Sequence, residues 1–141
     1  MAESIRLAQY FKMAVPNKPG EAVARLDTVK GAGVNLLAFS GFPRGGKAQL
    51  DFVPEDPARF QAVAKYHKWK LQGPKACFVV QGDDRVGAVA DMLERLVDAK
   101  INVTAADAVN AGKGRFAVLI FVKPGSVKKA AAALGVSEPH S

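Results

Sequence analysis

Hydrophobic and polar residues near the start of the chain follow the period of a strand and then that of a helix. Residues 10–15 predict a strand, which ends in a loop rich in proline and glycine. Apolar residues then recur at every third position, as they do in a helix with one buried face. Pro19 suits the first helical position, where its missing N–H costs nothing, and Gly33 favours the end of the helix. The apolar stripe consists of Val23, Leu26, Val29 and Ala32.

The pattern then predicts a pair of strands, a second helix and a closing strand. Residues 43–46, with the sequence Pro-Arg-Gly-Gly, predict a turn between the paired strands. Asp56 is a suitable N-cap for the second helix, and Pro57 fits its first position. The predicted elements are strands over 34–42, 48–53 and 68–71 and a helix whose inner face is Phe60, Val63 and Ala64.

The second half of the chain repeats this pattern 67 residues later, with Gly20 aligned to Gly87 and Asn35 to Asn102. Matching pairs in this register include Phe11 with Phe78, Leu26 with Leu93, Val29 with Leu96, Ala32 with Ala99 and Val34 with Ile101, and a further shift of two residues matches Phe52-Val53 with Phe121-Val122. The predicted elements are strands over 76–81, 102–109 and 116–122, a helix lined by Val86, Val89, Leu93, Leu96 and Val97, and a helix over 126–134.

Each half therefore has the order strand, helix, strand, strand, helix, strand, which is the ferredoxin-like βαββαβ unit. We expect an α+β protein with two tandem copies, each an antiparallel sheet with its helices on one face. The domains are expected at 1–72 and 73–141. The second copy lacks a clear fourth strand at its end. Ile5 and Leu7 alternate with polar residues, so residues 4–8 are a candidate for that edge; alternatively, the edge is absent or comes from a partner chain.

Two short motifs recur in both halves. The first half has Val15–Gly20, which contains Asn-x-Pro-Gly, and Ala32–Asn35, which contains Gly-Val-Asn. The second half has Asp84–Gly87 and Ala99–Asn102, where the proline is lost, the loop Asn is Asp and the Gly before the strand is Lys. These motifs resemble the ACT domain family of amino-acid-binding regulatory modules. The resemblance covers nearly the whole chain and implies a tandem ACT protein without a catalytic domain.

In ACT domains, ligands often lie between the first strand–helix loop of one domain and a neighbouring domain. Carried over by position, the resemblance implies a sensor that binds a small ligand and acts alone or on a protein partner such as a regulated enzyme. The implied ligand-binding residues are Asn17, Lys18, Pro19, Gly20 and Asn35 in the first half and Asp84, Gly87 and Asn102 in the second.

The chemistry of these loops suits a free amino acid. The first turn of a helix has N–H groups without intrahelical partners and a positive dipole end, which favour a carboxylate. Gly20 has no side chain, so a ligand can approach the backbone closely. Asparagine oxygens accept hydrogen bonds from an ammonium group, and we expect Asn17 and Asn35 to lie near each other. Alternatively, Asn17 ends a turn and Asn35 caps a strand.

Composition narrows the class of protein. The net charge is +7, with Lys and Arg spread along the chain, which indicates a solvated basic surface or a site for an anionic partner. No apolar run reaches the roughly 18 residues that cross a membrane. Arg6, Gln9 and Lys12 interrupt any apolar segment of a signal peptide. The single cysteine, Cys77, cannot form a disulfide within the chain, so we expect a cytoplasmic protein.

Two motifs point to phosphate or nucleic acid. Gly41–Ala48 nearly matches a phosphate-binding loop, but Ala48 replaces the hydroxyl residue and a strand follows instead of a helix, so we expect a hairpin turn. Residues 65–70, Lys-Tyr-His-Lys-Trp-Lys, interleave basic and aromatic side chains, as in proteins that bind single-stranded nucleic acid. We expect Trp69 to pack against the sheet edge and the lysines to face water.

No catalytic group, metal or cofactor is expected. His67 and His140 are the only histidines, and neither forms a recognisable arrangement with a serine or with Cys77, which we expect to be a buried thiol. Metal-ligand spacing is absent, and the acidic residues form no convincing catalytic pair.

The leading hypothesis is therefore a non-catalytic, allosteric sensor that binds a free amino acid at the strand–helix loop and domain interface. The alternative is a nucleic-acid-binding or protein-adaptor module on the same scaffold. A homodimer is expected, because one pair of modules leaves sheet edges and faces to cover.

Overall fold

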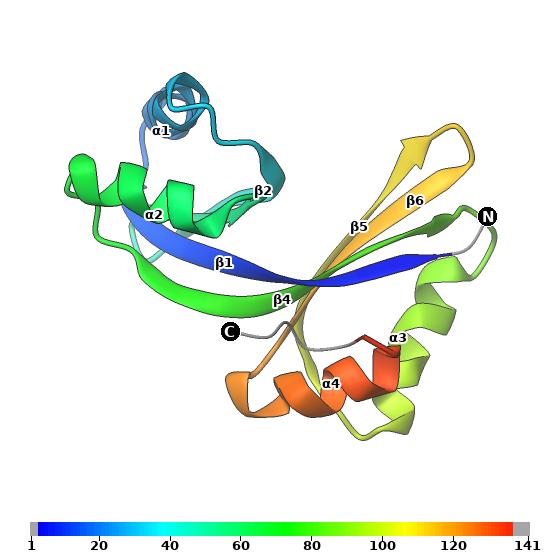
Figure 1. Ribbon diagram of the computed structural model, residues 1–141. Helices are drawn as coiled ribbons and strands as arrows, with labels where there is room; N and C mark the ends of the chain where they lie inside the picture. Colours follow the sequence, from blue (N-terminus) through cyan, green and yellow to red (C-terminus); the bar gives the residue numbers. More distant parts are fainter. Residues whose placement is uncertain (1–2, 137–141) are drawn as a thin grey trace. The chain divides into compact units, whose positions relative to one another are not determined.

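The computed structural model describes residues 3–136, which form two compact units (Figure 1). The first unit is Gln9–Lys75, and the second combines residues 3–8 with residues 76–136. No helix in the described range is long and apolar enough to cross a bilayer. The elements are β1 Ser4–Pro16, α1 Glu21–Gly31, β2 Leu36–Arg44, β3 Lys47–Pro54, α2 Pro57–Tyr66, β4 Gln72–Asp83, α3 Ala88–Asp98, β5 Val103–Gly112, β6 Arg115–Val122, the 3-10 turn η1 Pro124–Ser126 and α4 Val127–Leu134.

The first unit is one βαββαβ module with the strand order β2-β3-β1-β4. β3 lies antiparallel between β1 and β2, and Phe52 on β3 is opposite Phe11 on one side and Phe39 on the other. The closing strand is the beginning of β4 at Gln72, so the prediction of a closing strand over 68–71 is wrong. Lys68, shortly after the end of α2, has a positive φ of 57°, and Trp69 packs against the core. The chain therefore becomes extended only beyond these two residues.

The second unit is a βαββα module that takes its fourth strand from the start of the chain. Its strand order is β1-β4-β6-β5, where β1 contributes only its first residues. Ile5 and Leu7 on this segment pack against the core of the second unit. The hypothesis that residues 4–8 fill the vacant edge is therefore confirmed. Both β1 and β4 are long because each strand continues from one unit into the other.

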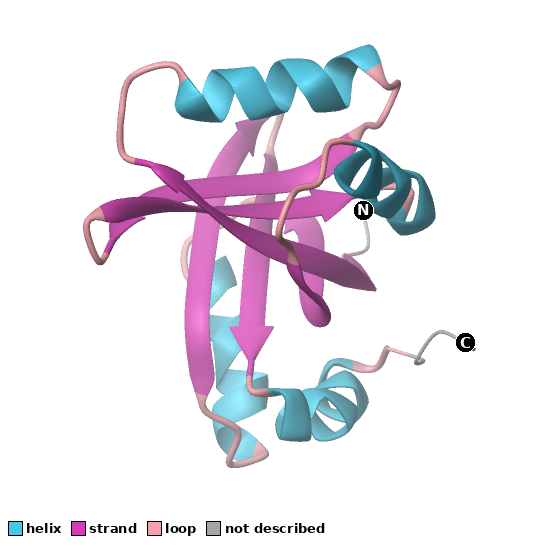
Figure 2. Cartoon of the chain, turned by 90° about the vertical axis from the view of Figure 1, so that its left-hand side faces the viewer, coloured by secondary structure: helices cyan, strands magenta, loops and turns pink. Residues whose placement is uncertain are grey.

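Each unit has its own core, between one face of its sheet and its two helices (Figure 2). The first core is aromatic: the Phe60 ring centroid on α2 lies 5.2 Å from that of Phe11 and 5.1 Å from that of Phe52. The second core is largely aliphatic, with Met92 and Leu96 of α3 packed against the sheet. The predicted fold class, an α+β protein of two βαββαβ repeats, is confirmed.

The alignment of β3 with β6 differs by one residue from the alignment that the sequence predicts. Phe11 is opposite Phe52 in the first unit, and its counterpart Phe78 is opposite Ile120 in the second. The structural equivalent of Phe52 is therefore Ile120, and the predicted match with Phe121 is wrong. A shift of one residue moves a side chain to the other face of the sheet, and Ile120 is the residue that joins the core.

The helices begin later than the apolar stripes predict. Gly20 and Gly87 are the N-caps of α1 and α3, so Pro19 lies before the helix and not at its first position. Val86 is fully exposed in the loop before α3, since the predicted stripe ran into that loop. Val23 and Val97 are also exposed, because they lie on the solvent side of their helices.

Candidate functional site

The two strand–helix junctions share one backbone feature. Gly20 has φ +87° and Gly87 has φ +83°, a left-handed conformation that strains any residue with a side chain. Neither helix has a side-chain cap, so the first amides of α1 and α3 lack the usual side-chain acceptor. A Cβ atom added at either glycine would meet nothing within 4 Å. Both junctions are therefore open on the glycine side.

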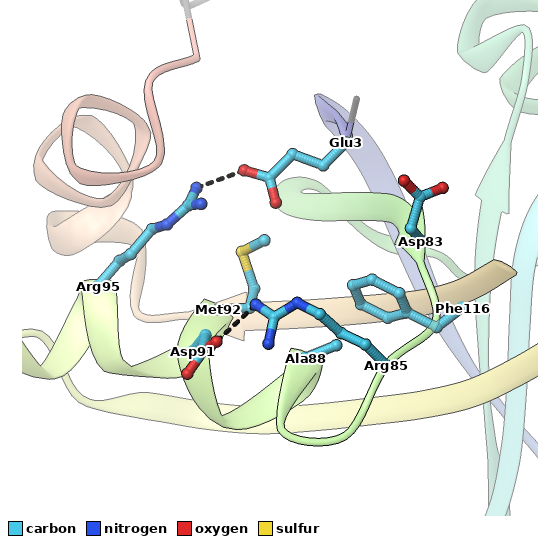
Figure 3. Close-up of a pocket in the computed structure, with 8 residues that line it drawn as sticks. All are labelled: Glu3, Asp83, Arg85, Ala88, Asp91, Met92, Arg95 and Phe116. Carbon is cyan, nitrogen blue, oxygen red and sulfur yellow. Dashed lines mark hydrogen bonds and ion pairs between the residues drawn. The ribbon is translucent and has the colours of Figure 1, made fainter. Parts of the chain in front are cut away.

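At the second junction, a cavity of about 170 Å³ opens between the end of β4, the start of α3 and the beginning of β1 (Figure 3). Its apolar surface comes from the buried side chains of Met92 and Phe116 and from Ala88. Its charged surface comes from two guanidinium groups and three carboxylates, which are Arg85, Arg95, Glu3, Asp83 and Asp91.

The charged residues of this cavity form ion pairs at its rim. The Arg85 Nη2 atom lies 2.5 Å from Asp91 Oδ2, and the Arg95 Nη1 atom lies 2.6 Å from Glu3 Oε1. Asp83 lies 2.8 Å from the Nη1 atom of Arg115. The arginine and aspartate of the first pair are more than half exposed, and ion pairs this exposed contribute at most about 1 kcal/mol each. A charged ligand can therefore exchange with them at small cost.

The cavity presents both signs of charge within a small volume. A guanidinium group binds a carboxylate through two parallel N–H donors, and a carboxylate accepts hydrogen bonds from an ammonium group. A cavity of about 150 Å³ holds a benzene-sized molecule, so this one suits a small amino acid rather than a nucleotide. The arrangement offers hydrogen-bond donors for an anionic group and acceptors for a cationic group, beside a small apolar surface.

The predicted residues Asp84 and Gly87 lie in the loop beside this cavity, but neither residue lines it. The backbone N–H of Asp84 donates to the carbonyl of Gly114 at 2.8 Å. Its carboxylate accepts a hydrogen bond from Asn110 Nδ2 at 2.6 Å. Asp84 therefore fastens the loop to the β5–β6 hairpin.

The residues of the first predicted site are divided between two ends of their unit. Asn17, Lys18, Pro19 and Gly20 follow the end of β1, where Pro16 is opposite Lys47. Asn35 precedes Leu36, which is opposite Pro54 at the other end of β3. Seven residue steps along a strand span roughly 23 Å. The expectation that Asn17 and Asn35 lie near each other is therefore wrong, because β1 and β2 are both antiparallel to β3 and so run parallel to each other, which places the end of β1 and the start of β2 at opposite ends of the sheet.

Asn35 and its counterpart Asn102 lie after the C-terminal ends of α1 and α3. The Asn35 Nδ2 atom donates to Glu55 Oε2 at 3.4 Å, and the Glu55 N–H donates to the Asn35 carbonyl at 2.8 Å. Asn102 precedes Val103, which is opposite Val122, whereas Asp83 is opposite Arg115. The second unit therefore separates its predicted site residues in the same way as the first.

Sequence reasoning missed most of the residues that line the cavity. Three of them were detectable, because Ala88, Asp91 and Arg95 recur at helical spacing and lie on one face of α3. Arg85 takes the place of Lys18 in the aligned loop. Glu3 had no local signal, since only the pairing of β1 with β4 brings it to this cavity.

The first junction differs in its charged residues. Arg25 takes the place of Met92 and makes an ion pair of 3.7 Å with Glu21, one helical turn earlier. Its guanidinium lies 5.9 Å from the centre of the Trp69 ring, a cation–π contact. The arginine therefore covers the aromatic core of the first unit, where the second unit has the apolar surface of its cavity.

The other motifs have structural roles. Gly45 and Gly46 both have positive φ in the turn between β2 and β3, so the expected hairpin turn is confirmed. Trp69 was expected to pack against the sheet edge, but it packs on Phe52 of the inner strand β3 and on Phe60 of α2. Cys77 is fully buried, as expected. Within residues 3–136, no group of three His, Cys, Asp or Glu side chains is placed to hold a metal.

Comparison with protein-family models found no match to this sequence, and comparison with curated proteins found none either. Solved structures are similar. Protein BT0572 from Bacteroides thetaiotaomicron is 17% identical, with a TM-score of 0.79 over 93% of this chain and 88% of that one. The ligand-free regulatory subunit of aspartate kinase from Thermus thermophilus is 15% identical, with a TM-score of 0.65 over 96% and 95%. E. coli aspartokinase III in complex with aspartate and ADP is 10% identical, with a TM-score of 0.55 over 94% of this chain and 32% of that one.

At these identities the similarity concerns the fold. The match to the Thermus regulatory subunit extends over nearly the whole of both chains, so it includes both repeats. The chain therefore shares its fold, over both repeats, with that regulatory subunit.

Proposed function

We propose that this chain is a non-catalytic regulatory module that binds a free amino acid at the β4–α3 junction of its second unit. The observation that carries the proposal is the cavity beside Gly87, which is lined by the ion pairs of Arg85 with Asp91 and of Arg95 with Glu3 and by a small apolar surface. The carboxylate of the ligand would accept hydrogen bonds from Arg85 and Arg95. The ammonium group of the ligand would take the place of these arginines in the ion pairs with Asp91 and Glu3.

Regulation is supported by the proteins that share the fold. One is a regulatory subunit, and another is an aspartokinase crystallised with aspartate and ADP. On this proposal the chain has no reaction of its own. Amino-acid binding changes how it acts on a partner, and a ligand shifts such an equilibrium only by binding one state more tightly. The regulated partner is then a protein, such as an enzyme.

We also propose that the protein forms a homodimer through the exposed edge of β5. β5 is the outer strand of its unit, and nine of its ten residues are exposed. Asp107 is its only charged residue, so the strand lacks the lysines and prolines that usually protect an edge. Val109→Lys should convert a dimer to a monomer in light scattering. Equal masses for both proteins, whether monomeric or dimeric, would contradict the role of this edge.

The ligand is tested by thermal unfolding and titration calorimetry with each of the twenty amino acids at 10 mM. A ligand present at 100 times its Kd adds about 2.7 kcal/mol to the free energy of unfolding, which raises the Tm by several degrees. Arg85→Gln and Asp91→Asn should each weaken binding at least tenfold. Arg59→Gln, on an exposed residue of α2, is the matched control and should leave binding unchanged.

A second pair of variants identifies which junction binds. Asn17→Ala and Lys18→Gln alter the first junction, and on this proposal they leave the calorimetric affinity within a factor of two. If they abolish binding while Arg85→Gln does not, the ligand site lies in the first unit. If no amino acid changes the Tm, the proposal is refuted.

A further inference from the structure

The positive charge of the protein is concentrated in one unit. The first unit contains eleven Lys and Arg residues against five Asp and Glu, a net charge of +6 out of the +7 of the whole chain. Among the described residues, the ion pairs that involve arginines 85, 95 and 115 all lie in the second unit, and the first has only the pair of Arg25 with Glu21. The excess charge of the first unit is therefore largely uncompensated.

Four of these cations line one cavity. It has a volume of about 530 Å³ and is formed by β1, the β2–β3 hairpin and the segment that leads into β4. Its cationic residues are Lys12, Arg44, Lys47 and Lys70. The volume lies within the range of about 300–1,000 Å³ that is usual for small-molecule sites.

Strand geometry explains why these cations gather on one face of the sheet. Lys12 lies between Phe11 and Met13, which both point into the core, so its side chain lies on the face away from the helices. Arg44 and Lys47 are opposite each other beside the Gly45-Gly46 turn. The near-match to a phosphate-binding loop therefore contributes two of the four cations, although its backbone forms a hairpin.

The carboxylate near this cavity is already engaged. Asp51 is opposite Lys12 and buried, and its Oδ1 atom accepts a hydrogen bond from Gln49 Nε2 at 2.9 Å. The Oε1 atom of Gln49 accepts from Arg44 Nη1 at 3.2 Å. One acidic group therefore faces four lining cations, with Lys75 as a further neighbour of Lys12.

The electrostatic state of Lys12 agrees with this imbalance. Burial lowers the pKa of Lys12, the charges of Lys75 and Arg44 lower it further, and the opposing effect of Asp51 does not compensate. A cation in this situation gains from a bound anion more than from water, because the anion relieves both the burial and the repulsion.

We infer that this cavity of the first unit binds a small anion that carries several phosphate groups. The four cations come from three separate segments and line a cavity, which suits a compact anion better than an extended strand of RNA. The ring of Tyr10 lies 6.0 Å from Lys12 Nζ but is buried, and the partly buried ring of Trp69 is stacked on Phe52 and His67, so neither offers an open face for stacking bases. This site is separate from the amino-acid site and does not depend on it.

The probe is sodium tripolyphosphate, titrated calorimetrically into the full chain at pH 7.5 in 50 mM NaCl. We expect a micromolar Kd for the wild-type protein and at least a tenfold weaker one for Lys12→Gln/Lys47→Gln. The control Lys128→Gln/Lys129→Gln removes the same charge from exposed residues of α4 and should change Kd less than twofold. Arg44→Gln/Lys70→Gln, at exposed positions, repeats the test if the first variant is unfolded in circular dichroism.

Two further measurements identify the source of the phosphate groups and a residue that they contact. Binding of adenosine triphosphate but not adenosine would support a nucleotide as the source of the phosphates. In an NMR titration of the Lys12 side chain, tripolyphosphate should raise the pKa of Lys12. Equal weakening by both double variants would overturn the inference, as would binding of single-stranded RNA that is tighter than binding of tripolyphosphate, or an absence of binding at 1 mM.

Discussion

One cross-strand pair of residues has its large and small members on opposite strands in the two units, so mutation can exchange them. In the first unit Val15 on β1 is opposite Ala48 on β3, and in the second Gly82 on β4 is opposite Phe116 on β6. The two pairs occupy equivalent positions, with the large and small residues exchanged between the strands. Phe116 also forms part of the apolar surface of the proposed amino-acid site.

The structure gives the cost of disturbing this pair. A Cβ atom at Gly82 would lie 2.4 Å from Cε1 and 3.0 Å from Cζ of the Phe116 ring, which is only 6% exposed. The ring has little room to move, and overpacking of this kind costs about 1–3 kcal/mol. Phe116→Ala removes the ring and leaves a cavity, which costs about 3–5 kcal/mol. Gly82→Ala is therefore expected to destabilise the protein and to displace part of the apolar surface of the cavity.

Urea unfolding followed by circular dichroism measures both effects. The variant Gly82→Val/Phe116→Ala places the residues of the first unit in the second, and its loss of stability should be smaller than the summed losses of Gly82→Val and Phe116→Ala by about 0.5–3 kcal/mol. Gly125→Ala is the control, since its added Cβ meets nothing within 4 Å. If Gly82→Ala unfolds at the same urea concentration as the wild type, the close contact with Phe116 does not exist and the reasoning fails.

Two further changes test the local structure. Lys100, after α3, has a φ of +60°, and its counterpart Gly33 in the first unit has a φ of +72°. Lys100→Gly should therefore raise the free energy of unfolding by about 0.5–1 kcal/mol, and Gly33→Lys should lower it. A loss of stability for Lys100→Gly in urea would contradict the strain at this position. Asp56 Oδ1 accepts a hydrogen bond from the Arg59 N–H at 3.1 Å. Asp56→Ala should therefore lower the free energy of unfolding by about 1 kcal/mol, and Asp56→Ser should lower it much less. Equal urea midpoints for the two variants would exclude a capping role.

Features that depend on a few neighbouring residues could be predicted from the sequence. The repeat follows from apolar spacing, and the fold class follows from the order of the predicted elements. The cap at Asp56 and the turn at Gly45 and Gly46 follow from backbone preferences that these residue types carry with them. The ACT-like motifs identified the loop at Gly87, beside which the cavity lies.

Features that depend on which strands are neighbours were decided only by the tertiary structure. β1 and β2 both pair antiparallel with β3 and so run parallel to each other, which places Asn17 and Asn35 at opposite ends of the sheet, although both belong to the matching motif. The pairing of β1 with β4 brings Glu3 to Arg95, about ninety positions away. The basic cavity likewise assembles Lys12 with Lys70 from distant segments. Hydrophobic period and turn chemistry act over one turn or one strand, whereas strand order is set by how complete sheets bury their faces.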